Sequence, residues 1–227
     1  MSKKKRSFLD RKKHCLFEPR KLWEISKLAI GHPTDEAFKI ITNALDKEYP
    51  GYIETKQNWI FNFAGGAMGQ MSLLHCSLRE YIILFGTSIG NEGHSGRYRA
   101  EVFDFVFEGE MLCEYENRSK PEVHKPGSPA YLPSSIVKHY RIKESAWMLE
   151  YARGNIISML PFGFGDSIIS ALDYITVLRT IKGYARLVLK NIFKHGKDVW
   201  ILIKWILIIT LPVTGLVYGL PLLFSIL

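Results

Sequence analysis

The stretch from Gly96 to Glu110, GRYRAEVFDFVFEGE, indicates the fold class because its side chains alternate with the two-residue period of a β-strand. One face of this strand carries Tyr98, Ala100, Val102 and Asp104. The other face carries Arg99, Glu101 and Phe103. Asp104 therefore shares the apolar face, where carboxylates are rare.

Further short apolar or alternating runs, separated by Gly and Pro, lie on both sides of this strand. They are YIILFG at 81–86, KPGSPAYLP at 125–133 and SAWMLEYARG at 145–154. Their pattern predicts an antiparallel sheet or barrel over residues 59–162. The period of two groups Glu150 with Met148 in the last run, and it groups Tyr81, Ile83 and Phe85 in the first.

If these faces line one interior, Asp104 and Glu150 converge in an apolar, aromatic cavity. Burial without a cationic partner raises the pKa of a carboxyl group, and two close acids tend to share one proton. The two residues are therefore candidate acid–base groups. The alternative is that either acid lies exposed on a strand face or pairs with an arginine. The arginines considered are Arg97, Arg141 and Arg153.

Helical patterns precede and follow the strands, so the class is α+β. Residues 17–30 have apolar side chains at helical spacing. Thr34 is the expected N-cap of a second helix, which Pro50 and Gly51 end. Residues 166–193 form an amphipathic, basic pattern that Gly183 is expected to divide into two helices.

Composition excludes several classes of protein. With 227 residues, of which 47% are hydrophobic, the chain is neither disordered nor fibrous. The net charge of +8 comes mostly from the first 22 residues, which hold nine basic residues against two acids, so a basic nucleic-acid-binding face is not expected. This basic arm is expected to bind anionic lipid, to serve as a retention signal or to be a solvated tail.

The cysteine and glycine patterns predict no metal and no cofactor. Cys15, Cys76 and Cys113 are odd in number and lack CxxC spacing, which indicates a reducing compartment rather than a disulfide framework or a zinc ribbon. The cluster GNEGHSGRYRAE at 90–101 lacks a second histidine beside His94. The glycines at 65–69 do not have the spacing of a dinucleotide fingerprint.

The C-terminus predicts a membrane anchor. Residues 205–227 carry no charge, and at about 1.5 Å of helical rise per residue they are long enough to span the hydrocarbon core. Basic residues before the span place the body of the protein in the cytoplasm. These patterns divide the chain into a basic arm (1–22), a helical lead-in (17–58), a barrel (59–162), membrane-adjacent amphipathic helices (163–196) and a C-terminal transmembrane anchor (199–227).

Long stretches between Leu16 and Phe193 resemble the family of fungal C-8 sterol isomerases and sigma-type non-opioid intracellular receptors. The matching stretches are NWIFNFAGGAMGQMSLLHCSLREYIILFGTSIGNEGHSGRYRAE, EVHKPGSPAYLP, WMLEYARG and MLPFGFGDSIISALDYITVLRT with GYAR. The resemblance implies a cupin-like β-barrel without metal, closed by two C-terminal helices that rest on the endoplasmic reticulum membrane. It also implies a homotrimer.

The resemblance implies roles for individual residues. In the receptors, the acid at Glu150 accepts the ammonium of a ligand and the acid at Asp104 hydrogen-bonds to it. The fungal isomerases instead carry an acid at Glu101, which makes Glu101 an alternative partner of Glu150. The positions that line the pocket are Met71, Tyr81, Ile83, Phe85, Ser95, Tyr98, Val102, Leu160, Thr180 and Tyr184.

The expected function is therefore a shift of the Δ8 double bond of a sterol to Δ7 through a carbocation. Within the family, AGGAMGQM and MLPFGFGD resemble the isomerase branch. The alternative is a receptor or chaperone-like membrane protein that binds cationic amphiphilic amines or sterols in the same pocket. A third interpretation is a tail-anchored scaffold with an unused cavity. Expected partners are membrane lipid and a sterol or amine, and no nucleic acid.

Overall fold

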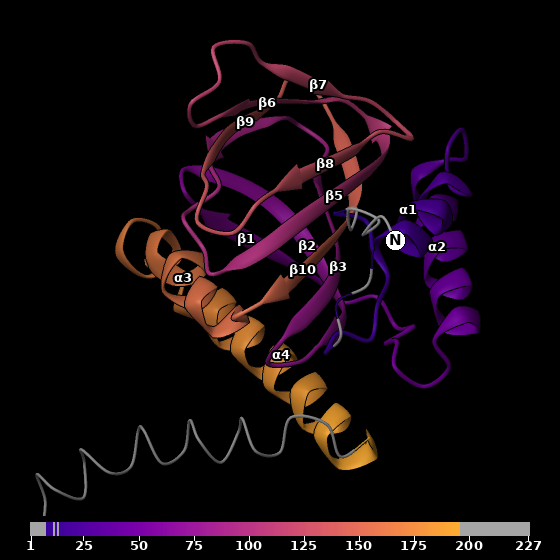
Figure 1. Cartoon of the computed structure of the whole chain (residues 1–227). Coiled ribbons are helices and arrows are strands. Elements are labelled where there is room, and N and C mark those ends of the chain that lie inside the picture. The colour runs from indigo at the N-terminus through magenta and orange to yellow at the C-terminus, as the bar shows by residue number, and fades with distance from the viewer. Residues whose placement is uncertain (1–7, 11, 13, 196–227) are drawn as a thin grey trace, which may run out of the picture. The chain divides into compact units, whose positions relative to one another are not determined.

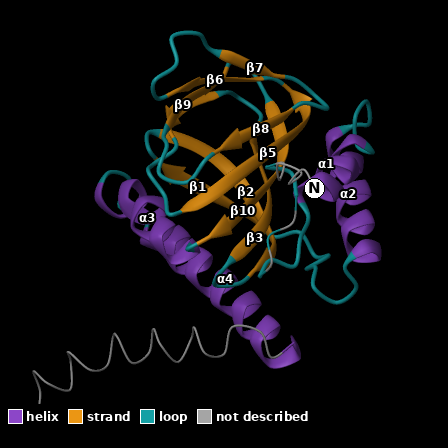
Figure 2. Ribbon diagram, viewed as in Figure 1, coloured by secondary structure: helices purple, strands orange, loops and turns teal. Residues whose placement is uncertain are grey.

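The computed structural model of the chain describes residues 8–195, apart from 11 and 13 (Figure 1). The predicted α+β class is confirmed within this part, where helices flank two antiparallel sheets (Figure 2). The chain divides into two compact units, Met1–Val188 and Leu189–Leu227, and the second is described only as far as His195. All of the described strands lie in the first unit.

The larger sheet has six strands in the order β1-β2-β3-β10-β5-β8. The strands are β1 (Trp59–Ala64), β2 (Ala67–Cys76), β3 (Glu80–Thr87), β5 (Ala100–Gly109), β8 (Pro129–Leu132) and β10 (Ala146–Gly154). Every pairing is antiparallel, and β10 lies between β3 and β5. The three apolar runs of the sequence therefore meet at the centre of one sheet.

The smaller sheet has four strands in the order β4-β9-β6-β7. The strands are β4 (Asn91–His94), β6 (Met111–Tyr115), β7 (Glu122–His124) and β9 (Lys138–Ile142). Buried side chains of both sheets pack together in one core, to which the larger sheet contributes Met71 and Val106 and the smaller sheet Met111 and Ile142. The two sheets thus enclose an interior, as the sequence predicted for a barrel.

The larger sheet is buried on both faces. Its other face packs against the N-terminal helices in a second, largely aromatic core that includes Phe103, Phe105 and Tyr151. Residues 102 and 104 of β5 belong to the inner face, whereas residues 103 and 105 belong to the outer one. The alternation predicted from the sequence is confirmed, and each face of β5 and β10 has its own environment.

The N-terminal helices are α1 (Pro19–Lys27) and α2 (Thr34–Glu48), and they lie on the outer face of the larger sheet (Figure 1). Helix α1 begins two residues later than predicted, because the N–H groups of Leu16 and Phe17 donate to Glu80 before the helix starts. The predicted N-cap at Thr34 is wrong. Pro33 occupies that position, and the Thr34 hydroxyl donates to Glu108 at 3.1 Å instead.

The predicted basic arm is not a separate tail from Phe8 onward, because it packs on the outer face of the larger sheet. The ring of Phe8 stacks on Tyr131 with 4.8 Å between the centroids. The guanidinium of Arg153 donates to the backbone carbonyls of Asp10 and Phe8 at 2.7 and 2.9 Å. The described part of the arm thus lies against the sheet, with Leu9 buried in the aromatic core and Phe8 still 43% exposed.

The C-terminal helices follow a short 3-10 turn, η1 (Ile156–Met159), and are α3 (Leu160–Ile169) and α4 (Tyr174–His195). The prediction that Gly183 divides them is wrong. The break lies at 170–173, where Leu172 has a positive φ of 54° and Asp173 accepts the N–H of Thr176 at 3.0 Å. Gly183 lies inside α4, where a Cβ would come within 3.1 Å of the Leu73 side chain.

No helix among residues 8–195 is long and apolar enough to cross a membrane. The predicted transmembrane anchor at 199–227 lies outside the described residues.

Candidate functional site

A cavity of about 180 Å³ lies in the interior between the two sheets. Residues from both sheets, from η1 and α3 and from the middle of α4 line it. Most of the lining is apolar or aromatic, including Phe85, Met148 and Phe162. Such a cavity accepts an apolar molecule and leaves the few polar groups in its wall to decide orientation and chemistry.

All ten residues that were predicted to line a ligand pocket border this cavity. They are Met71, Tyr81, Ile83, Phe85, Ser95, Tyr98, Val102, Leu160, Thr180 and Tyr184. The chain brings them together from β2, β3, β5, α3, α4 and the segment before β5. Their roles in ligand binding stay a prediction.

Glu150 lies at the centre of the larger sheet, in the middle of β10, and its side chain lines the cavity. In the pairing with the two neighbouring strands, it is opposite Asp104 on β5 and Ile83 on β3. The hydroxyl of Tyr81 donates a hydrogen bond to Glu150 Oε1 at 2.6 Å. One carboxylate oxygen is therefore fixed by a phenol.

Burial and the nearby carboxylate of Asp104 raise the pKa of Glu150 to about 7, because both disfavour the charged form. The hydrogen bond from Tyr81 and the ammonium of Lys138 act in the opposite direction without cancelling the effect. Near neutral pH both forms of Glu150 are populated. The residue can then donate a proton from its acid form and accept one in its carboxylate form.

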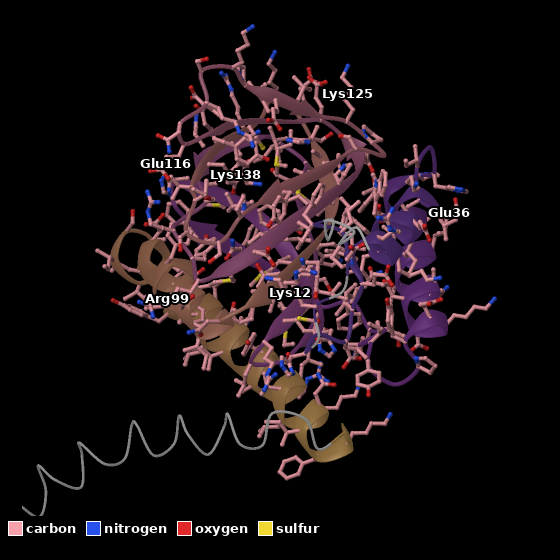
Figure 3. The ribbon with its side chains drawn as sticks, viewed as in Figure 1. Lys12, Glu36, Arg99, Glu116, Lys125 and Lys138 are labelled. Carbon is pink, nitrogen blue, oxygen red and sulfur yellow. The ribbon has the colours of Figure 1, made fainter. Side chains whose placement is uncertain are left out.

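Asp104 has a cationic partner of its own. The ammonium of Lys138 contacts Asp104 Oδ2, and the two side chains are only 6% and 4% exposed. Burial alone would lower the pKa of Lys138, but the carboxylate of Asp104 raises it above its usual range. Figure 3 shows Lys138 among the strands, whereas Lys125 lies at the outer edge of the sheets.

The alternative that an arginine neutralises Asp104 or Glu150 is wrong. Arg97 pairs with Glu116 at 2.8 Å, and Arg141 pairs with Glu92 at 3.2 Å. Arg153 lies on the outer face of the sheet. The sequence did offer a signal for the true partner, because the alternation of KHYRI at 138–142 puts Lys138, Tyr140 and Ile142 on one face.

Glu101 does not line the cavity, so its prediction as the partner of Glu150 is corrected. It lies on the outer face of β5, where it accepts from Tyr131 at 2.6 Å and from Arg153 at 2.8 Å and pairs with Lys12 at 2.6 Å. Partial burial alone would raise the pKa of Glu101, but these three donors lower it. Glu101 and Asp104 are three residues apart in β5, and side chains separated by an odd number of residues lie on opposite faces of a strand.

Helices α3 and α4 complete the wall of the cavity. The hydroxyl of Tyr184 donates to the Ser77 carbonyl at 2.6 Å, and Asp166 accepts the Gly66 N–H at 2.8 Å. Phe162 meets Tyr98 edge to face with 5.5 Å between the ring centroids. Phe162 was not among the residues predicted to line the pocket, although it belongs to the aromatic segment MLPFGFGD.

Among the described residues, no three His, Cys, Asp or Glu side chains lie close enough together to hold a metal ion. The ring of His94 accepts the backbone N–H of Gly96 at 2.9 Å through Nδ1.

The comparisons with known proteins agree over most of the chain. Residues 4–196 match the family described as "ERG2 and Sigma1 receptor like protein". The C-8 sterol isomerase erg2 of Aspergillus fumigatus is 38% identical over 195 residues, which cover 83% of this chain and 82% of the relative. The C-8 sterol isomerase of Neurospora crassa is 40% identical over 184 residues, which cover 79% and 72%.

A second group of relatives has a different name. The sigma non-opioid intracellular receptor 1 of Gallus gallus is 36% identical over 172 residues, which cover 75% of this chain and 78% of the relative. Among solved structures, an RmlC-like cupin from Shewanella frigidimarina is similar over 44% of this chain and 85% of that chain, with a TM-score of 0.38 and 14% identity. At that score the likeness adds nothing to the architecture described from the strands.

Proposed function

This chain belongs to the ERG2 and Sigma1 receptor like family, and from that premise we propose that it is a C-8 sterol isomerase. The reaction moves the Δ8 double bond of a sterol to Δ7. The observation that carries the proposal is Glu150, a buried carboxyl group with a pKa near 7 in the wall of an apolar cavity. A sterol offers the apolar body that such a cavity accepts, and its double bond needs a proton donor.

The isomerisation takes two proton transfers. The protonated carboxyl of Glu150 donates its proton to C9, the π electrons of the C8–C9 bond form the new C–H bond, and a cation is left at C8. A carboxylate then removes a proton from C7, and the electrons of that C–H bond form the C7–C8 double bond. Glu150 itself supplies this carboxylate, because its first transfer has just generated it and C7 and C9 both flank C8.

The wall around Glu150 suits the cationic intermediate. After the first transfer, the carboxylate of Glu150 presents a negative charge to this cation. Tyr81, Phe85 and Tyr98 supply aromatic rings near the site, and the face of an aromatic ring attracts a cation. A protonated amine with an apolar body resembles the C8 cation, so such amines should compete with the sterol.

The location of the protein is a further part of the proposal. A series of large apolar side chains on α3, on α4 and in the turn between them is exposed: Ile168, Ile169, Leu172, Ile175, Leu178 and Ile181. This surface would rest on the endoplasmic reticulum membrane, which dissolves the sterol, with the body in the cytoplasm and 199–227 as the anchor. Contact with membrane lipid and assembly as a homotrimer stay predictions, which vesicle flotation and light scattering of the purified protein would test.

The experiment is expression in a yeast strain that lacks the Δ8 isomerase, followed by sterol profiling. Wild type should restore Δ7 sterols, and Glu150→Gln should not, because an amide cannot donate and regain the proton. Glu110→Gln, an exposed acid between β5 and β6, is the matched control and should convert sterol like wild type. A Glu150→Gln variant that is folded, membrane-associated and fully active would refute the assigned role.

The receptor interpretation has its own supporting observation, since the same carboxylate and aromatic rings suit an ammonium and several relatives are named sigma receptors. If the wild type is expressed and leaves Δ8 sterols unconverted, the isomerase proposal fails. Amine binding that depends on Glu150 would then identify a receptor.

A further inference from the structure

Three charged groups stand in the wall of the cavity among the described residues: Glu150, Asp104 and Lys138. Six further titratable groups interact with these three, and they come from β3, β6, β7, β9 and the segment before β5. They are Tyr81, Tyr98, Cys113, Tyr115, His124 and Tyr140.

These six neighbours carry no charge near neutral pH. Burial raises the pKa values of the four tyrosines and of the Cys113 thiol, so all five stay protonated. Burial and the nearby ammonium of Lys138 lower the pKa of His124, so its ring stays neutral. Apart from the ring of His94, which also borders the cavity and whose Nδ1 accepts the N–H of Gly96, the charged groups that a ligand meets there are Glu150, Asp104 and Lys138.

Lys138 is held firmly in its position at the start of β9. Its backbone N–H donates to the Ser95 hydroxyl at 2.9 Å, and its carbonyl accepts the Ser95 N–H at 2.9 Å. Its ammonium reaches across from the smaller sheet to Asp104 on the larger one. Because both charged groups are almost completely buried, neither can readily turn away to another partner or to solvent.

We infer that Lys138 determines the ligand selectivity of the cavity. By neutralising Asp104 in a buried ion pair, it leaves Glu150 as the one acid in the described cavity wall whose charge no neighbouring cation balances. The ion pair thereby lowers the preference of the cavity for a cationic ligand relative to an uncharged apolar one. This inference rests on the proposed function only in taking the uncharged ligand to be a sterol. It makes Lys138 a specificity-determining residue that acts through Asp104.

The physical reason is the balance of charge in a site of low polarity. With Lys138 present, the pair contributes no net charge, and an approaching ammonium is attracted by Glu150 and by Asp104 but repelled by Lys138. Without Lys138, the two carboxylates would face the ligand together, and a cation would be attracted to both. An uncharged ligand of the same shape would sense little of this difference.

The test compares a cation and a neutral molecule of the same chain length. The probes are N,N-dimethyloctylamine and octan-1-ol, titrated calorimetrically at pH 7 into the full-length chain in detergent. The variants are Lys138→Met, Asp104→Asn, the double variant that carries both changes, and Lys138→Arg. Each is first checked for folding by circular dichroism.

Lys138→Met should bind the amine about tenfold more tightly, because it removes the repelling charge, and should bind octanol within about threefold of wild type. Asp104→Asn should bind the amine about tenfold more weakly, because the positive charge of Lys138 is then no longer balanced and repels the ammonium. The double variant and Lys138→Arg should return close to the wild-type affinity. A purely structural role for Lys138 predicts instead that Lys138→Met weakens both probes together.

Unchanged or weaker amine binding by folded Lys138→Met, with octanol binding retained, would overturn the inference. If that variant does not fold, Asp104→Asn decides, and amine binding as tight as in wild type would overturn it. The double variant removes both charges of the buried pair together, so neither is left without its partner, and it is the safest to fold. Affinities are measured without turnover, so failure of the sterol assay and failure of this inference are separate results.

Discussion

The two faces of β5 and β10 place the same kind of side chain in opposite electrostatic states. On the inner face, Glu150 is opposite Asp104 and its pKa is raised to about 7. Three residues further along the same pair of strands, Glu101 is opposite Arg153 on the outer face, and its pKa is lowered. Neighbours, rather than strand or residue type, decide which carboxyl group can exchange a proton near neutral pH.

Burial raises the pKa of both acids, and the donors and cations on each face decide whether that rise is overcome. Glu101 is surrounded by Lys12, Tyr131 and Arg153, which all favour its charged form. Glu150 has one phenol as a direct donor, and the nearest cation is already paired with Asp104. The outer face therefore holds the N-terminal segment on the sheet, whereas the inner face keeps a reactive proton in an apolar space.

The largest effect should separate the two acids by function. Glu150→Gln is expected to lower sterol conversion by about 10² to 10⁴-fold, the contribution that general acid–base catalysis makes to enzymes. Glu101→Gln is expected to retain conversion within about threefold per folded molecule. Sterol profiling, normalised to the amount of folded protein, measures both. Equal losses in the two variants would show that the faces do not differ in function.

The second effect should separate the faces by stability. Arg153→Ala removes the buried cation beside Glu101, leaving the largely exposed Lys12 as its partner, and takes the donors from two backbone carbonyls, which should cost about 3 kcal/mol of unfolding free energy. Chemical denaturation measures this change. Arg141→Ala, an exposed control on β9, should stay within about 0.5 kcal/mol of wild type. A similar small loss in Arg153→Ala would contradict the structural role of the outer face.

The third effect is the pH dependence of the wild type. Conversion requires protonated Glu150, so above pH 7 it should fall by about tenfold per pH unit as that form is lost. Below pH 7 it should level off, because most Glu150 is then protonated. Initial rates between pH 5.5 and 9 measure this, with the folded fraction checked at each pH. A rate that stays constant across this range would exclude Glu150 as the proton donor.

The smallest effect concerns the tyrosine that donates a hydrogen bond to each acid. Tyr81→Phe removes the hydrogen bond that lowers the pKa of Glu150, so the falling part of the pH profile should move to higher pH. Conversion at pH 7 should decrease by about three- to tenfold because the carboxyl group loses its positioning partner. Tyr131→Phe removes the corresponding contact from Glu101 and should leave the profile in place. A shift in both variants would point to a general loss of structure.

Local pattern alone predicted much of this fold. The period of two in 98–104, 81–86 and 147–154 assigned each side chain to a face, and the structure confirms that assignment. It could not predict the break between α3 and α4, because the helical pattern continues across 170–173 and the deciding feature is the backbone at Leu172. The N-cap of α2 was missed because Thr34 donates to Glu108, which is 74 residues away.

The sequence by itself determined the two-faced strands, the placement of Asp104 and Glu150 on one apolar face and the membership in the family. These features depend on periodicity and on long matching segments, both of which can be read along the chain. Only the tertiary structure decided that Lys138 neutralises Asp104 and that Glu101 binds the N-terminal segment. Ion pairs between distant strands depend on which strands become neighbours, so the charge state of a buried acid follows from the folded arrangement.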